Sequence, residues 1–438
     1  MAKTYDTYKD SGIAWIGNIP SGWSTIKNKY LYSLVYSGGT PTASEGKFYT
    51  EEGCPFVAIS DMSTTEYVTE TKKHLTEDGI ANKNLKILPS GTILYSIYAT
   101  VGVVSELMID ATISQAMLAI ELKSKINKSY YKYNLKAMKD YIFSQANGNT
   151  QFNLNAEKVS NFVFCFPPLS EQQAIATYLN KKCGEIDSLI SLQEEMISEL
   201  QAYKQSVITE AVTKGLDPNV PMKDSGVEWI GEIPNGWKVM PIRSLFDKRK
   251  QKNNPIISKE RLSLSIGVGI TKYADKTTNL DRFKDDFTAY QLAYKDDIVL
   301  NSMNMIVGAV GKSDFIGCVS PVYYVITAKQ NVSPDFYAYS LNTPKIRDVY
   351  HSLGRGIYAI ERGDGRVNTC RLKVPYYDFS IINMPVPPLS EQQAIASYLD
   401  EKTSKIDSLI ALKQEKITEL KDYKKSIIYE YVTGKKKV

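Results

Sequence analysis

The feature that most constrains the fold is a duplication within the chain of 438 residues. The segment KDSGIAWIGNIPSGW at residues 9–23 returns as KDSGVEWIGEIPNGW at residues 223–237, an offset of 214. A longer segment, PPLSEQQAIATYLNKKCGEIDSLI from Pro167, returns as PPLSEQQAIASYLDEKTSKIDSLI from Pro387, an offset of 220. Because self-similarity of this kind marks repeated structural units, we expect two copies of one architecture, each about the size of an ordinary domain.

Between these conserved ends the two copies have diverged. GTILYSIYATVG at residues 91–102 aligns with DIVLNSMNMIVG at residues 297–308, at an offset of 206. The offset therefore changes along the chain, as expected if loops have gained or lost residues. Each unit should keep a common frame while its middle part differs.

The longer repeat predicts a helix with a clear start in each copy. Ser170 and Ser390 can act as N-caps, because Gln173 and Gln393 stand where they can bond back to the cap amide and prolines lie just upstream. The apolar pattern continues to residue 212 in the first copy and to residue 432 in the second. Each helix would then span about 43 residues, or roughly 65 Å.

Apolar residues along both helices recur at the 3–4 spacing of a coiled-coil seam. In the first copy the seam includes either Leu189 or Ile190, and Gln193 and Lys413 interrupt it at matching places in the two copies. A helix of this length needs a partner, and a short connection before the second globular unit favours antiparallel pairing of the two copies about a pseudo-twofold axis. The alternative is that each helix packs only on its own globular domain.

These patterns predict an α+β chain with two α/β domains separated by two long antiparallel coiled-coil helices. The predicted boundaries are a first domain at residues 1–165, a first helix at 166–215, a second domain at 216–385 and a second helix at 386–438.

Composition excludes several classes of protein. No apolar run reaches the roughly 20 residues that a membrane-spanning helix needs, and the first residues lack the apolar stretch of a signal peptide, so we expect a cytoplasmic protein and no membrane partner. The five cysteines form no CxxC pair, which argues against structural zinc and a disulfide framework.

The sequence contains no catalytic motif that we can identify. GAVGKS at residues 308–313 resembles a phosphate-binding loop, but Ile306 occupies the position of its first glycine. The only two histidines, His74 and His351, form no HExxH pair, and no serine elbow is present. We therefore expect no catalytic residues and no metal site in this chain, which indicates a binding protein.

The second unit carries the positive charge. The formal net charge of the chain is +5, and all nine arginines lie between Arg243 and Arg371. KRKQKNN at residues 248–254 combines four cations, which can bind phosphate or guanine, with three amides, which can pair with adenine. GRGIYAIERGDGR at residues 354–366 is a glycine-rich stretch with three arginines, typical of a loop that approaches a ligand. A charge run can also be only a solvated face. The candidate DNA-binding residues of this unit are Lys250, Lys252, Asn253, Asn254, Asn304, Arg355, Arg362 and Arg366.

The first unit contains no arginine, so any base reading there must use amides, hydroxyls and lysines. The glycine pair in SGGTP at residues 37–41 predicts a close backbone approach. We expect this unit to read its part of a DNA target, a half-site, through contacts to adenine more than through arginine–guanine pairs. The candidate DNA-binding residues of this unit are Ser37, Thr40, Lys47, Tyr98, Thr100, Asn149, Gln151 and Asn153.

The chain resembles the specificity subunit of type I restriction–modification systems. The resemblance rests on PPLSEQQAIA, present twice at the start of a long helix after a variable domain, and on WIGxIPxGW at the start of each unit. It implies that each variable domain is a target recognition domain that reads one half of a split sequence in double-stranded DNA. The paired helices would set the gap between the halves and bind partner subunits.

The same resemblance implies the partners and their cofactors. Two adenine-specific methyltransferase subunits would bind S-adenosylmethionine, and ATP-driven restriction subunits would bind ATP and Mg²⁺, with no cofactor in this chain. Tyr203 and Tyr423 on the helices are candidate docking residues for these partners, although they could also only cover the seam.

Two other functions remain to be tested. One is a coiled-coil adaptor that joins proteins without touching DNA, which the low net charge and the acidic balance of the first unit favour slightly. The other is an intrinsic nuclease or methyltransferase, against which the missing motifs argue.

Overall fold

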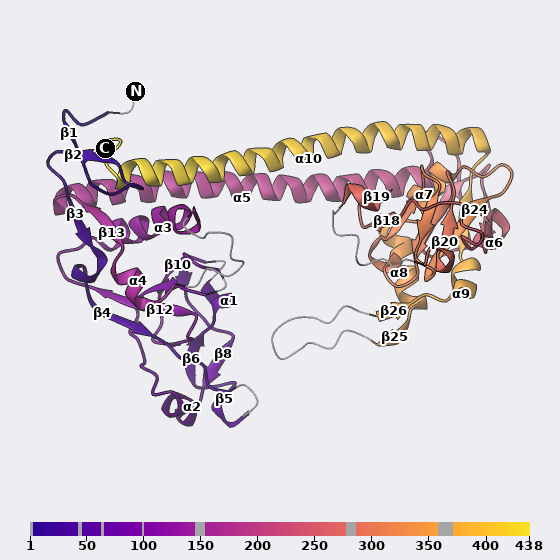
Figure 1. Ribbon diagram of the computed structural model, residues 1–438. Coiled ribbons are helices and arrows are strands. Elements are labelled where there is room, and N and C mark those ends of the chain that lie inside the picture. Colours follow the sequence, from indigo (N-terminus) through magenta and orange to yellow (C-terminus); the bar gives the residue numbers. More distant parts are fainter. Residues whose placement is uncertain are drawn as a thin grey trace. The chain divides into compact units, whose positions relative to one another are not determined.

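The computed structural model describes residues 3–42, 46–62, 65–98, 100–144, 154–276, 286–357 and 371–438. The chain forms two compact units (Figure 1). Unit 1 comprises Met1–Glu194 and Glu415–Val438, and unit 2 comprises Glu195–Gln414. Each unit mixes helix and sheet and includes part of both long helices. The four-segment division expected from the sequence stays a prediction, because it assigns each helix to a segment of its own.

The main sheet of unit 1 has five strands in the order β4-β12-β9-β10-β7. All neighbours are antiparallel except β10 and β7. Helix α3 covers one face, where Tyr131, Leu135 and Met138 share an apolar core with Tyr95 and Leu118. The strands and helix are β4 (Tyr32–Ser37), β7 (Tyr67–Val68), β9 (Ile93–Ser96), β10 (Val104–Leu107), β12 (Met117–Leu122) and α3 (Lys128–Ser144).

Shorter elements complete unit 1. A second sheet has the order β11-β6-β8-β5, and two strand pairs, β1 with β2 and β3 with β13, join the ends of the unit. These elements are β1 (Tyr8–Asp10), β2 (Asn18–Pro20), β3 (Ser24–Lys27), β5 (Tyr49–Thr50), β6 (Cys54–Val57), α1 (Ile59–Met62), β8 (Lys73–Leu75), α2 (Glu77–Asn82), β11 (Thr112–Ile113), α4 (Ala156–Ser160) and β13 (Val163–Phe166).

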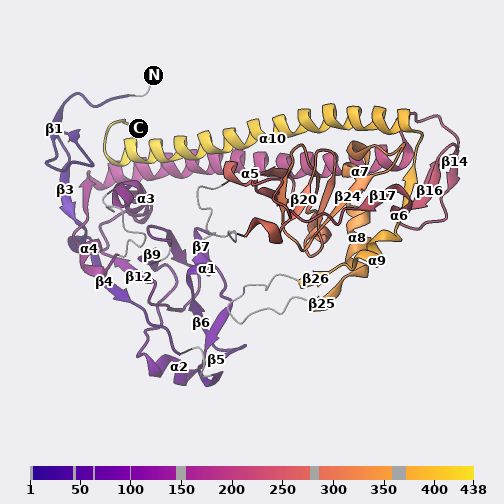
Figure 2. The same cartoon turned by 45° about the vertical axis from the view of Figure 1, so that its right-hand side comes forward.

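The main sheet of unit 2 repeats this order with four antiparallel strands, β17-β24-β21-β22. Helices α7 and α8 take the place of α3 (Figure 2). These elements are β17 (Phe246–Lys248), β21 (Ile298–Asn301), β22 (Val310–Lys312), β24 (Tyr323–Ala328), α7 (Pro334–Ser340) and α8 (Pro344–Leu353).

The remaining elements of unit 2 are short and lie around this sheet. They are β14 (Met222–Asp224), β15 (Glu232–Pro234), β16 (Lys238–Pro241), α6 (Ile242–Leu245), β18 (Leu262–Ser265), β19 (Gly269–Lys272), β20 (Gln291–Ala293), β23 (Gly317–Val319), β25 (Arg355–Ile357), β26 (Arg371–Lys373), α9 (Tyr376–Ser380) and β27 (Asn383–Val386).

Strand register confirms that the two sheets are copies. Tyr32 pairs with Leu122 in unit 1, and Phe246 pairs with Ala328 in unit 2, at the offsets of 214 and 206 that the sequence repeats show. Ile93 pairs with Ile120, however, whereas Ile298 pairs with Ile326, so the β9 and β21 strands match at an offset of 205. The reason is that the connection from β21 to β22, residues 302–309, is one residue longer than the connection from β9 to β10, residues 97–103.

The long helices are α5 (Leu169–Lys214), of 46 residues, and α10 (Leu389–Val432), of 44 residues. The predicted caps are wrong, because the helices begin before Ser170 and Ser390. The Pro168 carbonyl accepts from the amides of Glu171 and Gln172, which satisfies the first turn without a serine side chain.

The glutamine that bonds back toward the helix start is Gln172, and not Gln173 as the sequence suggested. Its buried side chain donates to the Pro167 carbonyl at 2.9 Å and accepts from the Asn127 amide at 3.1 Å. Gln392 makes the same two contacts in unit 2, to Pro387 at 2.8 Å and from Ser333 at 2.8 Å. Each long helix is thereby fixed to the segment that precedes α3 or α7.

The two repeated sequence motifs pack against each other in each unit. The Trp23 indole N–H donates to the Glu171 carboxylate at 2.8 Å, and the Trp237 indole donates to Glu391 at 3.0 Å. Both tryptophans are buried, at 2% and 1% exposure. A buried indole that donates to a carboxylate at a helix start explains why both motifs stayed alike after the duplication.

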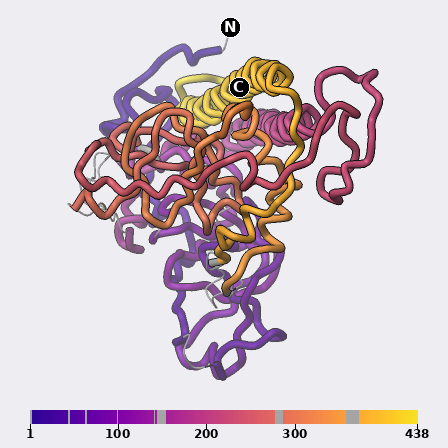
Figure 3. Tube along the Cα trace, turned by 90° about the vertical axis from the view of Figure 1, so that its right-hand side faces the viewer, coloured from indigo at the N-terminus to yellow at the C-terminus, as the bar shows by residue number. Residues whose placement is uncertain are grey.

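Within each unit the two long helices lie side by side and run in opposite directions (Figures 1 and 3). In unit 1, Lys424 of α10 pairs with Asp187 of α5 at 2.6 Å. In unit 2, Lys204 of α5 pairs with Asp407 of α10 at 2.7 Å, the same two positions exchanged at the offset of 220. Ile190 is 9% exposed and Leu189 is 47% exposed, so Ile190 is the residue that faces the partner helix.

Candidate nucleic-acid interface

In unit 2 an exposed loop projects from the end of the main sheet. Residues 302–309 connect β21 to β22, and the loop exposes Asn304 together with 40% of Met303 and 49% of Val307. Gly308 closes the loop with a positive φ of 93°. The Ser302 carbonyl accepts from the Val374 amide at 3.0 Å, which fixes the loop to the chain just after β26. We call residues 302–308 the unit 2 hairpin loop.

Unit 1 has the same arrangement in its hairpin loop, residues 97–102. Tyr98 is 39% exposed, Thr100 is exposed, and Gly102 closes the loop with a φ of 86°. The Ile97 carbonyl accepts from the Leu154 amide at 3.1 Å, which matches the Ser302–Val374 bond in unit 2. The two loops are therefore equivalent in backbone contacts and different in side chains.

Five of the predicted DNA-binding residues lie outside the described residues. They are Asn149, Gln151, Asn153, Arg362 and Arg366. Leu154 and Val374 follow these two segments in the chain, and both are bonded to a hairpin loop. Leu154 and Val374 thus make equivalent backbone contacts in the two units.

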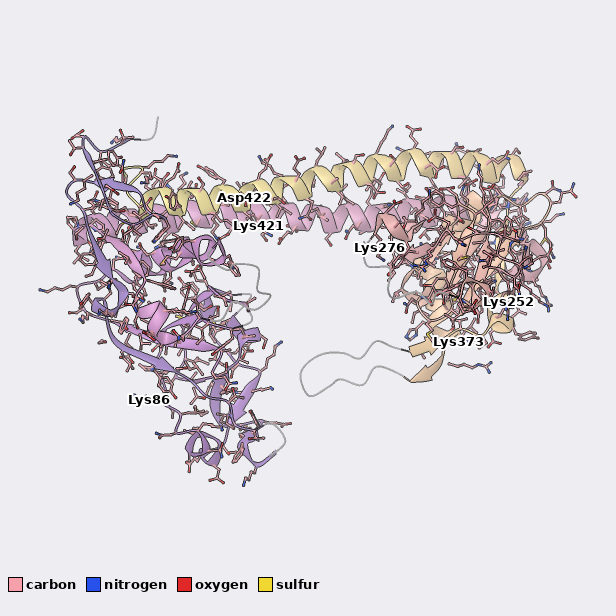
Figure 4. The ribbon with its side chains drawn as sticks, viewed as in Figure 1. Lys86, Lys252, Lys276, Lys373, Lys421 and Asp422 are labelled. Carbon is pink, nitrogen blue, oxygen red and sulfur yellow. The ribbon has the colours of Figure 1, made fainter. Side chains whose placement is uncertain are left out.

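A group of lysines lies beside the unit 2 hairpin loop. Lys248 sits over the rings of Tyr376 and Tyr324, with its ammonium 4.3 Å and 5.1 Å from their centroids. Burial lowers the pKa of Lys248, and the nearby ammoniums of Lys250 and Lys373 lower it further. Lys250 and Lys373 are exposed, and Figure 4 shows Lys373 on β26. We call Lys248, Lys250 and Lys373 the basic patch of unit 2.

The basic segment at residues 248–254 has a more structural role than the sequence suggested. Asn253 is fully buried, donates to the carbonyls of Ser258 and Phe287, and accepts from two backbone amides. This corrects the prediction that its amide is available to bases. Arg249 makes a two-point ion pair with the buried Asp297, at 2.6 and 2.9 Å. Lys250, Lys252 and Asn254 remain exposed.

Arg355 lies at the start of the β25–β26 hairpin. Its side chain is 74% exposed, and it pairs with Asp378 at 2.7 Å. Since that carboxylate is mostly buried, it holds the guanidinium at the base of the hairpin. Arg355 therefore stays a candidate phosphate contact, although one of its guanidinium nitrogens already donates to Asp378.

The other predicted residues of unit 1 lie on different elements. Ser37 ends β4, and Thr40 follows the glycine pair of residues 38 and 39. The predicted close approach is internal: a Cβ on Gly38 would lie 2.0 Å from the Ile113 carbonyl oxygen. Lys47 lies at the second sheet with its ammonium 5.0 Å from the centroid of the Phe48 ring.

The long helices expose apolar side chains at repeated positions. Tyr203 and Tyr423, the candidate partner contacts, are 55% and 54% exposed, so neither is sealed under the seam. The structure adds two pairs that sequence reasoning missed, and all three pairs keep the offset of 220. The added residues are Leu189 with Leu409 and Leu192 with Leu412, between 45% and 61% exposed.

The described residues offer no ready site for other chemistry. No group of three or more His, Cys, Asp and Glu side chains among them is arranged to hold a metal ion. In the same part of the chain, the helices are too short or too polar to cross a membrane.

Comparison with known proteins defines the class. The family described as type I restriction modification DNA specificity domain matches the chain twice, over residues 20–202 and 234–422. These matches cover most of the chain, which therefore belongs to this family.

Individual relatives agree with this assignment. A Methanocaldococcus jannaschii protein provisionally named the MjaX specificity subunit of a type I restriction enzyme is 27% identical, over 97% of this chain and 96% of its own. The MjaVIII specificity subunit of the same organism is 26% identical over 74% of each chain. A chain in a solved structure of a type I R-M system shares the fold, with a TM-score of 0.64 and 15% identity, and the match covers 94% of this chain and 98% of that one.

The chain is accordingly a type I specificity subunit: the DNA-recognition subunit, and not the catalytic one, of such a system. The two copies of the family domain correspond to the two repeats found in the sequence.

Proposed function

We propose that each unit reads one half of a split, asymmetric DNA sequence through its hairpin loop and the described residues beside that loop. The observation that carries this proposal is the repeated bond from Leu154 to Ile97 and from Val374 to Ser302. Two equivalent frames present unlike side chains, Tyr98 and Thr100 in one unit and Asn304 in the other. Unlike side chains on like frames should select unlike half-sites.

Phosphate contacts from lysines would supply most of the affinity, and base contacts would supply the choice. The basic patch of unit 2, Lys248, Lys250 and Lys373, suits the first role because it lies next to a hairpin loop. Binding through such contacts weakens steeply as salt is added.

We also propose that α5 and α10 form an antiparallel coiled coil that holds the two readers at a fixed separation. Support comes from the contacts within each unit, where Lys424 meets Asp187 and Lys204 meets Asp407. A stiff spacer of this kind would leave unread base pairs between the half-sites, as in other paired readers. Joining two weak readers also raises their combined affinity.

The partners that we propose are two methyltransferase subunits and the restriction subunits of a type I complex. The exposed repeated residues of the helices, with Tyr203 and Tyr423 among them, offer two alike surfaces for two alike partners. S-adenosylmethionine, ATP and Mg²⁺ would bind those partners, and none of them this chain. The complex would act in the cytoplasm, where the genomic DNA lies.

Selection from a randomised duplex pool tests the proposed function. The full chain, bound to its methyltransferase subunit, should enrich two short base blocks separated by a constant number of unselected positions. An adaptor that does not touch DNA would enrich nothing, and a single uninterrupted block would contradict reading by two units. Sequence-dependent cleavage or methylation by the purified chain alone would instead support an intrinsic enzyme.

A further inference from the structure

The side chain of a basic residue packs against the glycine that closes each hairpin loop, through its methylene groups in unit 1 and through its guanidinium in unit 2. A Cβ built on Gly102 would lie 3.0 Å from Cγ of Lys139, and one built on Gly308 would lie 2.8 Å from Nη2 of Arg347. Lys139 belongs to α3, which follows β12, and Arg347 belongs to α8, which follows β24 and α7. The same local arrangement, a glycine with positive φ beneath a cationic side chain, thus occurs once in each unit.

The glycine is necessary for this arrangement. With φ values of 86° and 93°, both positions disfavour any residue with a side chain. At Gly308 a side chain would also displace the Arg347 guanidinium, which lies within 3 Å of where a Cβ would be, and at Gly102 it would press on the methylene chain of Lys139. The conformation of the loop and the position of the cation therefore depend on each other.

These two cations lack a carboxylate partner. Among the described residues, no carboxylate lies within ion-pair distance of Lys139 or Arg347, and the Arg347 guanidinium bonds to the neutral Asn342 Oδ1 at 2.9 and 3.2 Å. Arg347 is partly buried, and burial lowers its pKa. Arg347, as a partly buried cation without a counter-charge, costs free energy that a bound anion would recover. Lys139 is exposed, so its ammonium is accessible to an anion without this cost of burial.

The surroundings in unit 1 are also positive. Gly102 and Lys139 line a cavity of about 920 Å³ together with Lys136, Lys424 and two further lysines of α10. Lys136, Lys424 and Lys425 are paired with Glu66, Asp187 and Asp422. Lys421, shown on α10 in Figure 4, has no carboxylate within ion-pair distance among the described residues. The unit that lacks arginine therefore carries unpaired lysine charge beside its reading loop.

We propose that Lys139 and Arg347 are equivalent phosphate anchors, each of which binds one backbone phosphate of the DNA next to the hairpin loop of its unit. The proposal rests on the proposed function and adds to it the residues that would position each loop on its half-site. A phosphate contact fixes register without reading a base, so the two anchors can be alike in role although the half-sites differ.

The test measures DNA affinity against NaCl concentration for the full chain bound to its methyltransferase subunit, with the selected duplex and a scrambled duplex as probes. Lys139→Gln and Arg347→Gln should each weaken binding to both duplexes by about tenfold, because each removes one charged hydrogen bond. Each should also lower the slope of log affinity against log salt by about one. Arg347→Lys should keep most of the slope.

Two further variants complete the test, Arg243→Gln as a control and Gly308→Ala as a second way to disturb the contact. Arg243→Gln removes an exposed arginine of the same unit, far along the chain from the loop, and should leave the slope unchanged. Gly308→Ala should act like Arg347→Gln, because its new methyl group displaces the guanidinium. Thermal melting of each variant checks that the fold is retained.

The outcomes separate this inference from the proposed function. Wild-type selectivity with an unchanged salt slope in both glutamine variants would overturn the anchors and leave the reading function intact. A changed base preference at one half-site would also overturn them, since it would make the cation a base reader. No binding of DNA by the wild-type complex would overturn both proposals.

Discussion

At the scale of single residues, the junction between globular part and helix end depends on a few contacts that are made twice. Gly434 follows α10 with a φ of 71°, and a Cβ there would lie 2.4 Å from Cδ of Pro20 and 3.1 Å from the Trp23 ring. Trp23 in turn donates to Glu171 at the start of α5. One small cluster therefore joins the first repeated motif to the beginning of one helix and the end of the other.

Gly434→Ala should destabilise unit 1 by more than Gly12→Ala. Both glycines have a φ near 70°, at 71° and 72°, but a Cβ on Gly12 would have nothing within 4 Å. Gly12→Ala should cost about 1 kcal/mol of backbone strain, and Gly434→Ala should cost about 2–3 kcal/mol because it also pushes Pro20 away. Urea unfolding measures both, and equal losses would show that the contact at the helix end is unimportant.

Lys132 bridges two carboxylates, Glu66 and Glu106, at 3.1 and 3.0 Å, with only 5% of its side chain exposed. Burial raises the pKa of Glu106, but the ammoniums of Lys128 and Lys132 outweigh it, so the pKa is lowered in the folded state. A lowered pKa stabilises the fold above the unfolded value of about 4.3, and this stabilisation is lost as the pH falls through the folded value.

Glu106→Gln should therefore reduce the loss of unfolding free energy that occurs as the pH falls below about 5. It should also lower the free energy of unfolding at neutral pH by about 1 kcal/mol. The measurement is the urea midpoint as a function of pH. Glu70→Gln, which removes an exposed carboxylate of the same unit, is the control, and its urea midpoint should change with pH as that of the wild type does. Parallel curves for Glu106→Gln as well would rule out the bridge as a source of acid sensitivity.

At the scale of elements, both long helices were predicted from the sequence. Their exact first residues and their buried faces were not, because both depend on contacts with other parts of the chain. The start signals around Ser170 and Ser390, together with the 3–4 spacing, located both long helices to within two residues, and the helices start at Leu169 and Leu389. It could not choose between Leu189 and Ile190, because adjacent residues both fit the pattern and only packing decides. The serine caps failed because the Pro168 carbonyl already accepts the first amides.

Ile190→Ala should lower the stability of the fold, whereas Leu189→Ala should weaken the binding of a partner. Ile190 is 9% exposed and Leu189 is 47% exposed. Ile190→Ala should lower the free energy of unfolding by about 2–3 kcal/mol, and Leu189→Ala by less than about 0.5 kcal/mol. Leu189→Ala should instead weaken binding of the methyltransferase subunit, measured by calorimetry. The proposed docking surface would be refuted if partner affinity stayed at the wild-type value in Leu189→Ala, Leu192→Ala and Tyr423→Ala alike.

The candidate site was only partly predictable for a similar reason. Exposed residues such as Tyr98, Thr100 and Asn304 stood out by residue type, and the structure places them on equivalent loops. Asn253 was indistinguishable by type, yet its burial among backbone groups is set by residues far along the chain, such as Phe287. Lys139 and Arg347 gave no local signal, since only the fold brings each one to its glycine.

At the scale of the whole molecule, the duplication was evident from the sequence, and the common order of the main sheets follows from it. The proposed spacer role makes a quantitative prediction. Insertion of one heptad into both helices, after Gln193 and after Lys413, should add about 10 Å of helix. The gap between the half-sites should then grow by about three base pairs, at 3.4 Å per pair, with both blocks unchanged.

Selection from the randomised pool would measure this change directly. An unchanged gap in the double insertion would show that the helices do not set the spacing. Insertion into α5 alone is the control, and it should impair binding because it shifts Asp187 and Lys204 out of register with their partners on α10.

The most direct test of reading by two separate units is a chimera in which residues 242–386 are replaced by a second copy of residues 28–166, so that both frames carry the same reader. Duplex selection should then return two copies of one half-site in inverted orientation, the half-site that wild type reads with unit 1. A target that keeps both original blocks, or that becomes one uninterrupted block, would contradict the account.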